Sequence, residues 1–191
     1  DHSHDCAVPV AELVDYAGEQ GLGAIAITDH NVFAGAKEGA ELARGRGLTV
    51  IPGEEIKTDA GEVIGLFLEQ EIERGLSMAE TIAAIREQGG VVYLPHPFDR
   101  LHTIPDAPTL HRHLAEIDVF EVYNARLLFE TYNEEALRFA RKYNLPIRIV
   151  VVPGGHIMTV DTKRRIYREP RGRNTGAGHP ASQPGSWPAV S

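Results

Sequence analysis

Side chains that can bind metal ions occur at three points where an apolar run of the chain ends. Asp29-His30 follows the first apolar run, Glu54-Glu55 follows the second, and His96 follows a later one. Neutral imidazoles together with carboxylates suit Zn, Mn or Fe, whereas Mg or Ca would prefer oxygen ligands alone. The pattern therefore predicts a divalent metal site that takes its ligands from separate loops.

Each of these segments also has a simpler interpretation when it is taken alone. A histidine at a strand end can cap a loop, Glu54-Glu55 can form a solvated turn, and Asp29-His30 can be the orienting pair of a general base. Three separate loops would then have to place ligand-type residues at strand ends by chance. The shared position of the three segments favours the metal site.

The elements that must position these residues alternate between helix and strand. Apolar residues at helical spacing, with suitable capping residues, predict helices at 9–20, 33–46, 77–88 and 130–143. Short apolar runs predict strands at 23–28, 48–52, 62–68, 91–94, 118–123 and 146–152. This order is typical of an α/β fold with a parallel sheet, open or closed, in which the carboxyl ends of the strands form the ligand face.

The composition limits the classes of partner. The formal charge of -8 argues against binding to duplex nucleic acid, which rests on Lys and Arg neutralising phosphates, whereas a nucleotide in a metal-lined pocket is compatible with it. The single cysteine, Cys6, excludes an internal disulfide and a multi-cysteine zinc site and suits a reducing, cytoplasmic compartment. Because there is no run of about 18 apolar residues, no membrane span is predicted. The oligomeric state stays unknown.

The chain changes character near Arg148. Residues 1–145 hold 12 Lys or Arg against 25 Asp or Glu, whereas residues 146–191 hold 7 against 2. Beyond Glu169 the chain is mostly Pro, Gly, Ser, Arg and small residues, which bury too little apolar area to offset the entropy of ordering. We therefore predict one α/β domain over residues 1–152 and an irregular or disordered tail over residues 153–191.

Four segments together resemble successive motifs of the PHP (polymerase and histidinol phosphatase) family. They are Leu22–Asn31, Val50–Ile56, Pro95–Asp99 and Glu121–Asn124, within a resemblance that spans roughly residues 1–147. The resemblance implies a distorted (β/α)7 TIM-like barrel whose strand ends hold two or three divalent ions (Mn, Zn or Fe). The implied function is that of a metal-dependent phosphoesterase, which hydrolyses a small phosphate ester or nucleotide through a metal-activated water.

The resemblance also implies roles for individual residues. His30, Glu55 and His96 take the positions of metal ligands, and Asn124 stands where a further metal-site residue is expected. Asp29 is expected to act in catalysis without binding metal itself, by orienting a ligand or by hydrogen-bonding the bound water.

Both ends of the chain depart from the family pattern. The family begins with a strand that ends in His-x-His, and His2-Ser3-His4 supplies those letters. The spacing to Pro9 fits a later Ser-x-Asp loop better, which makes Asp5 a metal-site carboxylate. The true His-x-His strand would then lie upstream of residue 1, so that the barrel is truncated at its N-terminus. His2 and His4 are weaker candidates for the metal site.

At its other end the family places Gly-Ser-Asp-x-His after a strand, whereas this chain reads Val152-Pro-Gly-Gly-His156. The aspartate is missing, and His156 is a candidate remnant of the ligand pair. Together with the reversal of charge, this leads to the hypothesis that the reading frame slips near Arg148 and that the C-terminal tail is aberrant. Sequencing of the gene that found an unshifted frame without Asp-x-His coding potential would reject this hypothesis.

Three functions therefore stay open. One is a phosphoesterase, for which Arg100 and Arg126 are candidate contacts to the substrate phosphate, with a surface role as the alternative for each. The second is a catalytically inactive metal-binding or structural PHP module. The third is an amidohydrolase-like metallohydrolase on a similar barrel. The substrate cannot be identified from a general motif, because specificity resides in the loops.

Overall fold

A mixed β-sheet lies at the centre of the protein. The computed structural model describes residues 2, 8–124, 127–145, 147–150 and 157–158, all within Asp1–Val160, the first of the two units into which the chain divides. The strands follow the order β6-β5-β4-β3-β2-β1-β7 across the sheet. Their bounds are β1 (Ala24–Ile27), β2 (Thr49–Lys57), β3 (Glu62–Leu66), β4 (Val91–Leu94), β5 (Val119–Asn124), β6 (Ile147–Val150) and β7 (Ile157–Met158).

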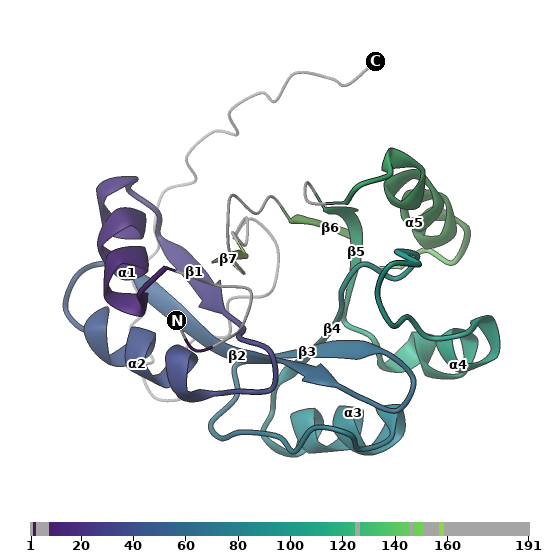
Figure 1. Cartoon of the computed structure of the whole chain (residues 1–191), viewed down its shortest axis with the longest axis horizontal. Helices are drawn as coiled ribbons and strands as arrows, with labels where there is room; N and C mark the ends of the chain where they lie inside the picture. Colours follow the sequence, from purple (N-terminus) through teal and green to yellow (C-terminus); the bar gives the residue numbers. More distant parts are fainter. Residues whose placement is uncertain (1, 3–7, 125–126, 146, 151–156, 159–191) are drawn as a thin grey trace, which may run out of the picture. The chain divides into compact units, whose positions relative to one another are not determined.

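Helices occupy most of the connections between these strands. Those of the described residues are α1 (Val10–Glu19), α2 (Ala34–Leu42), α3 (Met78–Glu87), α4 (Ala107–His113), the short 3-10 helix η1 (Leu114–Glu116) and α5 (Glu130–Lys142). They lie on the outer side of the curved sheet (Figure 1). Since β6 and β7 are the edges of the sheet within the described residues, the fold is an α/β curled half-barrel.

The pairing of β3 departs from the predicted parallel sheet. Strand β3 runs antiparallel to both β2 and β4, whereas β1–β2, β4–β5 and β5–β6 are parallel pairs. Only residues 58–61 connect β2 to β3, which is too few for the crossover that a parallel pair requires. The turn is closed by Thr58, whose backbone nitrogen donates to the Gly61 carbonyl oxygen over 2.8 Å. The start of β3 therefore lies at the same edge of the sheet as the end of β2.

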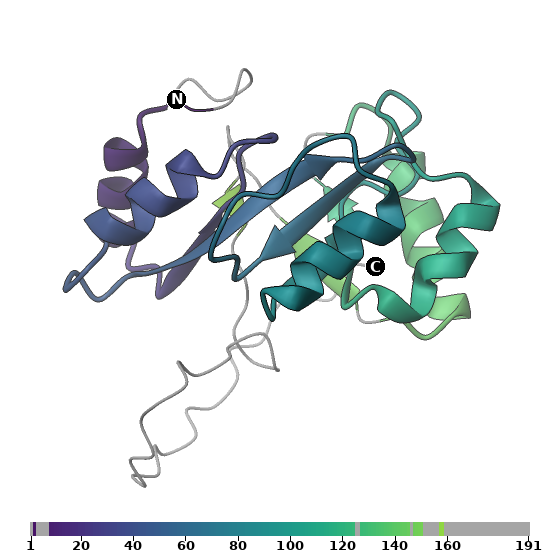
Figure 2. The same ribbon diagram turned by 90° about the horizontal axis from the view of Figure 1, so that it is seen from below.

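The helices bury apolar side chains against the outer face of the sheet. Helix α2 packs on β2, α3 packs on β3 and β4, and α5 packs on β5. Figure 2 shows α3, in teal, in front of the sheet. Ile25 of β1, Ile85 of α3 and Phe120 of β5 are fully buried in this layer. The helices cover the outer face of the sheet, and the ends of the strands remain at its edge, where a site can form.

Two helix starts show how the sequence directs the local structure. At α3 the predicted capping box is present: Glu80 N donates to Ser77 Oγ over 3.2 Å, and Ser77 N donates to Glu80 Oε2 over 2.9 Å. Helix α4, which was not predicted, begins in the same way, because Asp106 Oδ1 accepts a hydrogen bond from Thr109 N over 2.8 Å. The segment has few apolar residues, and Leu110 is the one it buries. Helical periodicity was therefore too weak to indicate it.

The predicted tail, residues 153–191, lies outside the described residues except for Ile157 and Met158. These two residues form β7, which pairs antiparallel with β1 in the register Ala26↔Met158. In the described part of the chain, no helix has the length and apolar character needed to cross a membrane.

Candidate metal centre

His30 follows β1 and is held against β2 by the backbone. All four residues of β1 are buried, and beyond them His30 forms an isolated parallel bridge with Glu55. Glu55 N donates to the Asp29 carbonyl oxygen over 3.1 Å, and Asn31 N donates to the Glu55 carbonyl oxygen over 2.9 Å. Asn31 has a φ of 53°, a left-handed conformation that asparagine adopts more readily than most residues, and it ends the extended segment.

Two carboxylates come from the hairpin formed by β2 and β3. Glu55 and Lys57 lie on one face of β2, since side chains alternate along a strand, and Lys57 stands opposite Glu62 in the antiparallel register. Glu62 therefore shares a face and a sheet edge with Glu55. The Glu55 side chain is 2% exposed and that of Glu62 is 14% exposed, so both carboxylates are largely removed from water.

His96 follows the end of β4 and completes a cluster of four side chains, which are those of His30, Glu55, Glu62 and His96. His96 Nε2 lies 3.3 Å from Glu55 Oε1 and 3.4 Å from Glu62 Oε2. His30 contacts the other oxygen of each carboxylate: its Nε2 lies 3.8 Å from Glu55 Oε2, and its Nδ1 lies 3.7 Å from Glu62 Oε1. The two carboxylates thus stand between the two imidazoles, and each presents one oxygen to either ring.

The donor set and its spacing fit divalent metal ions. Metal–ligand distances of about 2.1 Å place neighbouring donor atoms of a tetrahedral site about 3.4 Å apart. The distances of 3.3 and 3.4 Å from His96 Nε2 match this value. One ligand atom from each of His30, Glu55 and Glu62 also lies within 4.8 Å of the other two. Glu62 Oε2 is buried and makes no hydrogen bond with the described residues, which leaves it able to accept a cation.

Two opposing effects act on the pKa of His96. Burial lowers it, but the hydrogen bond to Glu55 and the charges of Glu55, Glu121 and Glu62 raise it, and the net shift of the pKa is upward. A proton on this ring supplies the positive charge that a cation would bring to the two carboxylates. Metal binding must displace that proton, so the metal affinity of the cluster is expected to rise with pH.

The sequence predicted that Glu54 and Glu55 follow the strand. The structure instead places both residues within β2. Glu54 is fully buried, and alternation along the strand turns it to the face opposite Glu55. Glu54 Oε2 accepts a hydrogen bond from Ile72 N over 2.9 Å, and Oε1 is buried without a hydrogen-bond partner among the described residues. Burial raises the pKa of Glu54 to about 7, with a further increase from the charge of Glu71. Glu54 is therefore not part of the cluster.

Asp29 and His2 both lie against the first turns of α2. A Cβ atom on Gly35 would stand 2.2 Å from Asp29 Oδ2 and 3.0 Å from His2 Cδ2, so the glycine makes room for both side chains. His2 Nε2 lies 2.9 Å from Glu38 Oε2, which ties His2 to α2 and not to the four-residue cluster. The Asp29 carboxylate lies beside Gly35 in the first turn of α2, where the helix dipole favours a negative charge.

The remaining sequence candidates divide into two groups. Arg100 is exposed, and its Nη2 lies 3.9 Å from Glu135 Oε2 on α5. Asn124 donates from Nδ2 to Glu121 Oε2 over 3.2 Å, so it contacts a neighbour of the cluster. Four further candidates lie outside the described residues: His4, Asp5, Arg126 and His156.

Glu62 is the cluster residue that was not predicted. The predicted ligands all lie at or near strand ends, whereas Glu62 begins β3. A usable signal is the turn sequence Asp59-Ala60-Gly61 between two apolar runs, which indicates a hairpin. A hairpin would have placed the first residue of the second strand beside the last residues of the first.

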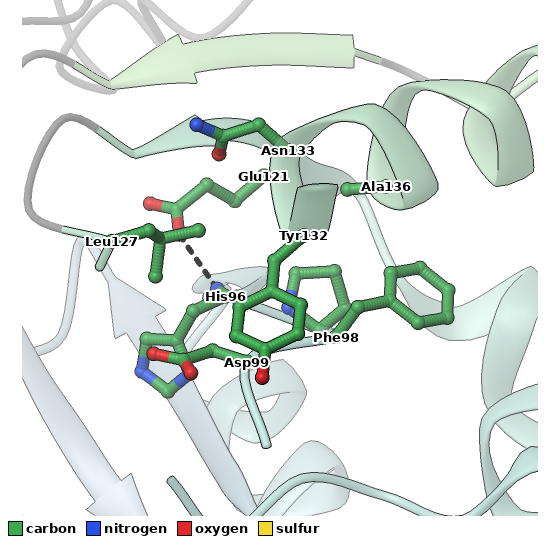
Figure 3. Close-up of a pocket in the computed structure, with 9 residues that line it drawn as sticks. His96, Phe98, Asp99, Glu121, Leu127, Tyr132, Asn133 and Ala136 are labelled. Atoms are coloured by element: carbon green, nitrogen blue, oxygen red, sulfur yellow. Dashed lines mark hydrogen bonds between the residues drawn. The ribbon is translucent and has the colours of Figure 1, made fainter. Parts of the chain in front are cut away.

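A small recess adjoins His96 on the side of α5 (Figure 3). Phe98 and Tyr132 contribute apolar surface to it, and Asp99 and Glu121 contribute carboxylates. In Figure 3 the carboxylate of Glu121 points at the backbone of His96. Polar and apolar side chains of α5 and of the loop after β4 therefore lie next to the cluster.

The four cluster residues lie in a part of the chain that matches a known protein family. The family model described as the PHP domain matches residues 1–144, which is most of the chain. The chain belongs to the PHP family. The family assignment made from the four sequence motifs is thereby confirmed, and this PHP domain includes the whole cluster described above.

Two proteins of Methanocaldococcus jannaschii, both named as uncharacterized, are similar to this PHP domain in sequence. One is 40% identical over 115 residues, which cover 59% of this chain and 64% of the relative. The other is 44% identical over 98 residues, which cover 49% of this chain and 41% of the relative. The matched part of the chain spans less than two thirds of the length of either relative.

Three solved structures share the fold of this PHP domain. A two-domain protein from Bacteroides vulgatus, named as containing a predicted PHP-like metal-dependent phosphoesterase, aligns with a TM-score of 0.60 and 23% identity over 75% of this chain and 46% of its own. A candidate metal-dependent phosphoesterase from Bifidobacterium adolescentis aligns with a TM-score of 0.64 and 19% identity over 82% of this chain and 89% of its own. An amidohydrolase from Chromobacterium violaceum, with bound sulfate and no metal, aligns with a TM-score of 0.58 and 13% identity over 80% of this chain and 84% of its own.

Proposed function

We propose that this PHP domain is a metal-dependent phosphoesterase that hydrolyses a small phosphate ester, a class that includes nucleotides, through a metal-activated water. The observation that supports the proposal most is the arrangement of four ligand-type side chains, in which Glu55 and Glu62 each face both imidazoles. Carboxylates that present separate oxygens to two histidines would be able to hold divalent cations. The mixture of nitrogen and oxygen donors suits Mn, Zn or Fe, with two or three ions where further ligands allow them.

The charge of the cluster explains why the proposed activity needs metal. Two largely buried carboxylates repel a phosphate group, and only bound cations can reverse the local potential. When bound, divalent ions supply Lewis acidity and lower the pKa of a coordinated water towards neutrality. The task of His30 and His96 is to offer neutral nitrogen lone pairs, and that of Glu55 and Glu62 is to balance the cationic charge.

Residues beside the cluster would orient these groups and the substrate. We assign Asp29 an orienting role in catalysis, because its carbonyl oxygen accepts the hydrogen bond of Glu55 N and its carboxylate lies against α2. Arg100 and Arg126 remain proposed contacts to the substrate phosphate, and Arg100 has an exposed side chain that its weak pairing with Glu135 leaves able to move. Asp5 and His156 remain proposed additional ligands.

We also propose that the curled sheet belongs to a distorted (β/α)7 TIM-like barrel. The half-barrel arrangement supports this, since helices cover its outer face. The isolated bridge between His30 and Glu55 also places two cluster residues side by side just beyond the end of β1. In barrels of this type the active site lies at the end of the barrel where the parallel strands terminate. His30 and His96 follow parallel-paired strands, and the hairpin adds Glu62 at the same edge.

The test uses the full chain, freed of metal with a chelator and then titrated with Mn²⁺ or Zn²⁺ by calorimetry. Hydrolysis of p-nitrophenyl phosphate and of nucleoside monophosphates is measured on the same samples. We expect metal binding together with phosphate release, and in His96→Ala and Glu62→Gln we expect weakened but measurable metal binding together with loss of phosphate release. His111→Ala is the matched control, because His111 bonds to Ala107 O and Tyr143 Oη and takes no part in the cluster.

The outcomes separate the three functions. Unchanged metal content and turnover in both cluster variants would reject the assignment of the site. Metal binding without any phosphate release identifies an inactive or structural PHP module. Hydrolysis of N-acetyl substrates without phosphate release identifies an amidohydrolase-like enzyme, for which the shared fold with the Chromobacterium violaceum protein offers an analogy.

A further inference from the structure

The backbone of His96 has a conformation that its sequence alone does not favour. Its φ is 29°, in the left-handed region that residues other than glycine rarely adopt. The residue is also only 9% exposed, so protein atoms surround it on most sides. Such a conformation costs about 1–3 kcal/mol and persists only where the surrounding structure holds it. The residues that hold it therefore contribute to the geometry of the cluster.

Two groups bind the strained backbone: Asp99 N donates to the His96 carbonyl oxygen over 3.0 Å, and the side chain of Glu121 on β5 binds His96 N. Glu121 Oε2 accepts a hydrogen bond from His96 N over 2.6 Å, the interaction drawn in Figure 3. Its other oxygen, Oε1, accepts a hydrogen bond from Tyr93 Oη over 2.7 Å. Glu121 is 4% exposed and Tyr93 is 1% exposed, so the two side chains form a buried connection between β5 and β4.

The network continues from Glu121 into α5. Asn124 Nδ2 donates to Glu121 Oε2 over 3.2 Å, and Asn133 Oδ1 accepts a hydrogen bond from Asn124 N over 2.9 Å. Three donors thus converge on one carboxylate, which is a group that only accepts hydrogen bonds when ionised. An amide at this position would present a donor to at least one of them. An ionised carboxylate therefore satisfies all three donors at once.

We propose that Glu121 is a positioning residue of the metal centre, which holds the His96 backbone in its left-handed conformation and so directs His96 Nε2 at Glu55 and Glu62. The inference rests on the proposed function, because it assigns His96 as a metal ligand. Glu121 acts through His96, and none of its described hydrogen bonds reaches the two carboxylates of the cluster. Groups that orient a ligand in this way typically change metal affinity about 10- to 100-fold when they are removed.

The experiment measures metal affinity in the full chain by calorimetry with Mn²⁺, and the visible absorption of the Co²⁺-loaded protein as a reporter of imidazole ligation. We expect Glu121→Gln to weaken Mn²⁺ binding about 10- to 100-fold and to alter the Co²⁺ spectrum. Glu116→Gln is the control, because Glu116 also pairs with a histidine, His113, but at an exposed position away from the cluster.

A double-mutant cycle with His96→Ala distinguishes positioning from a general loss of structure. If Glu121 acts through His96, Glu121→Gln changes the affinity of the His96→Ala protein little. An equal decrease in both backgrounds, or no decrease in either, overturns the inference. Where Glu121→Gln does not fold, Tyr93→Phe keeps the volume and removes one hydrogen bond to the carboxylate, and an unchanged affinity in that variant also overturns the inference.

Failure of the inference and failure of the proposed function give different results. A wild-type chain that binds neither Mn²⁺ nor Co²⁺ contradicts the proposed function, and the inference falls with it. A wild-type chain that binds both ions, together with a Glu121→Gln variant of the same affinity and spectrum, leaves the proposed function intact and overturns the inference alone.

Discussion

Glu54 offers the sharpest test of the energetics of the fold, because a fully buried carboxyl group has one hydrogen bond where it could accept several. Its Oε2 accepts from Ile72 N, while Oε1 is buried without a hydrogen-bond partner among the described residues. The proposed perturbation is Glu54→Gln, which keeps the shape and the acceptor for Ile72 and removes the ionisable proton. The variant should be more stable relative to wild type at high pH than at low pH.

The magnitude follows from two pKa values. The Glu54 carboxyl titrates at 4.5 in the unfolded chain, and burial raises its pKa to about 7 in the folded protein. Below pH 4.5 both states are protonated, so the stability is fully present there. It is lost as the pH rises through 4.5 towards about 7, because the unfolded chain ionises first. Each pKa unit corresponds to about 1.4 kcal/mol, so the loss between about pH 5 and about pH 8.5 is about 2.5 kcal/mol.

The assay is urea unfolding of wild type and Glu54→Gln at about pH 5 and about pH 8.5, with a chelator present so that bound metal adds no stability. The difference in unfolding free energy between the two proteins should change by about 2.5 kcal/mol between these conditions. Any fixed cost of burying the amide cancels in this comparison. Glu80→Gln is the control, since Glu80 is exposed and its pKa is lowered by its bonds to Ser77, so its effect should not change over this range. Parallel pH profiles for wild type and Glu54→Gln would refute the reasoning.

Three further substitutions test the local structure, all by urea unfolding. Gly53→Ala should destabilise the protein by about 1–3 kcal/mol, because its Cβ would lie 2.6 Å from the Gly65 carbonyl oxygen inside the β2–β3 hairpin. Gly18→Ala in α1, where a Cβ meets no atom within 4 Å, should instead stabilise it by about 0.5–1 kcal/mol. Ser77→Ala should cost about 1 kcal/mol through loss of the α3 cap, and an unchanged unfolding midpoint would contradict the role of the capping box.

Much of the candidate site could be predicted because its ligands follow strands that are readable as apolar runs. His30 and His96 come after the buried segments Ala24–Ile27 and Val91–Leu94, which have little ambiguity in a sequence. The register that brings His30 beside Glu55 could not be read from the sequence, but parallel strands end at a common edge in any case. This general property of α/β sheets was therefore enough to predict that these residues lie close together.

The parts that could not be predicted depend on contacts between distant segments. Glu54 and Glu55 are adjacent and chemically identical, yet one faces the cluster and the other accepts a bond from Ile72, because β2 continues through both. Glu62 depends on an antiparallel pairing that the alternation of helices and strands did not suggest. The left-handed backbone of His96 depends on Glu121, a residue of another strand.

The β2–β3 hairpin has a consequence for how the site assembles. Its two carboxylates are joined by one short turn, so the chain entropy lost in bringing them together is small, and this half of the donor set can form from local sequence alone. The two histidines come from segments far apart in the chain and meet the carboxylates only when β1 and β4 have docked on either side. Under the proposed function, tight metal binding would therefore be a late event in folding, and a cation would hold together the first and middle portions of the chain, which the hairpin separates.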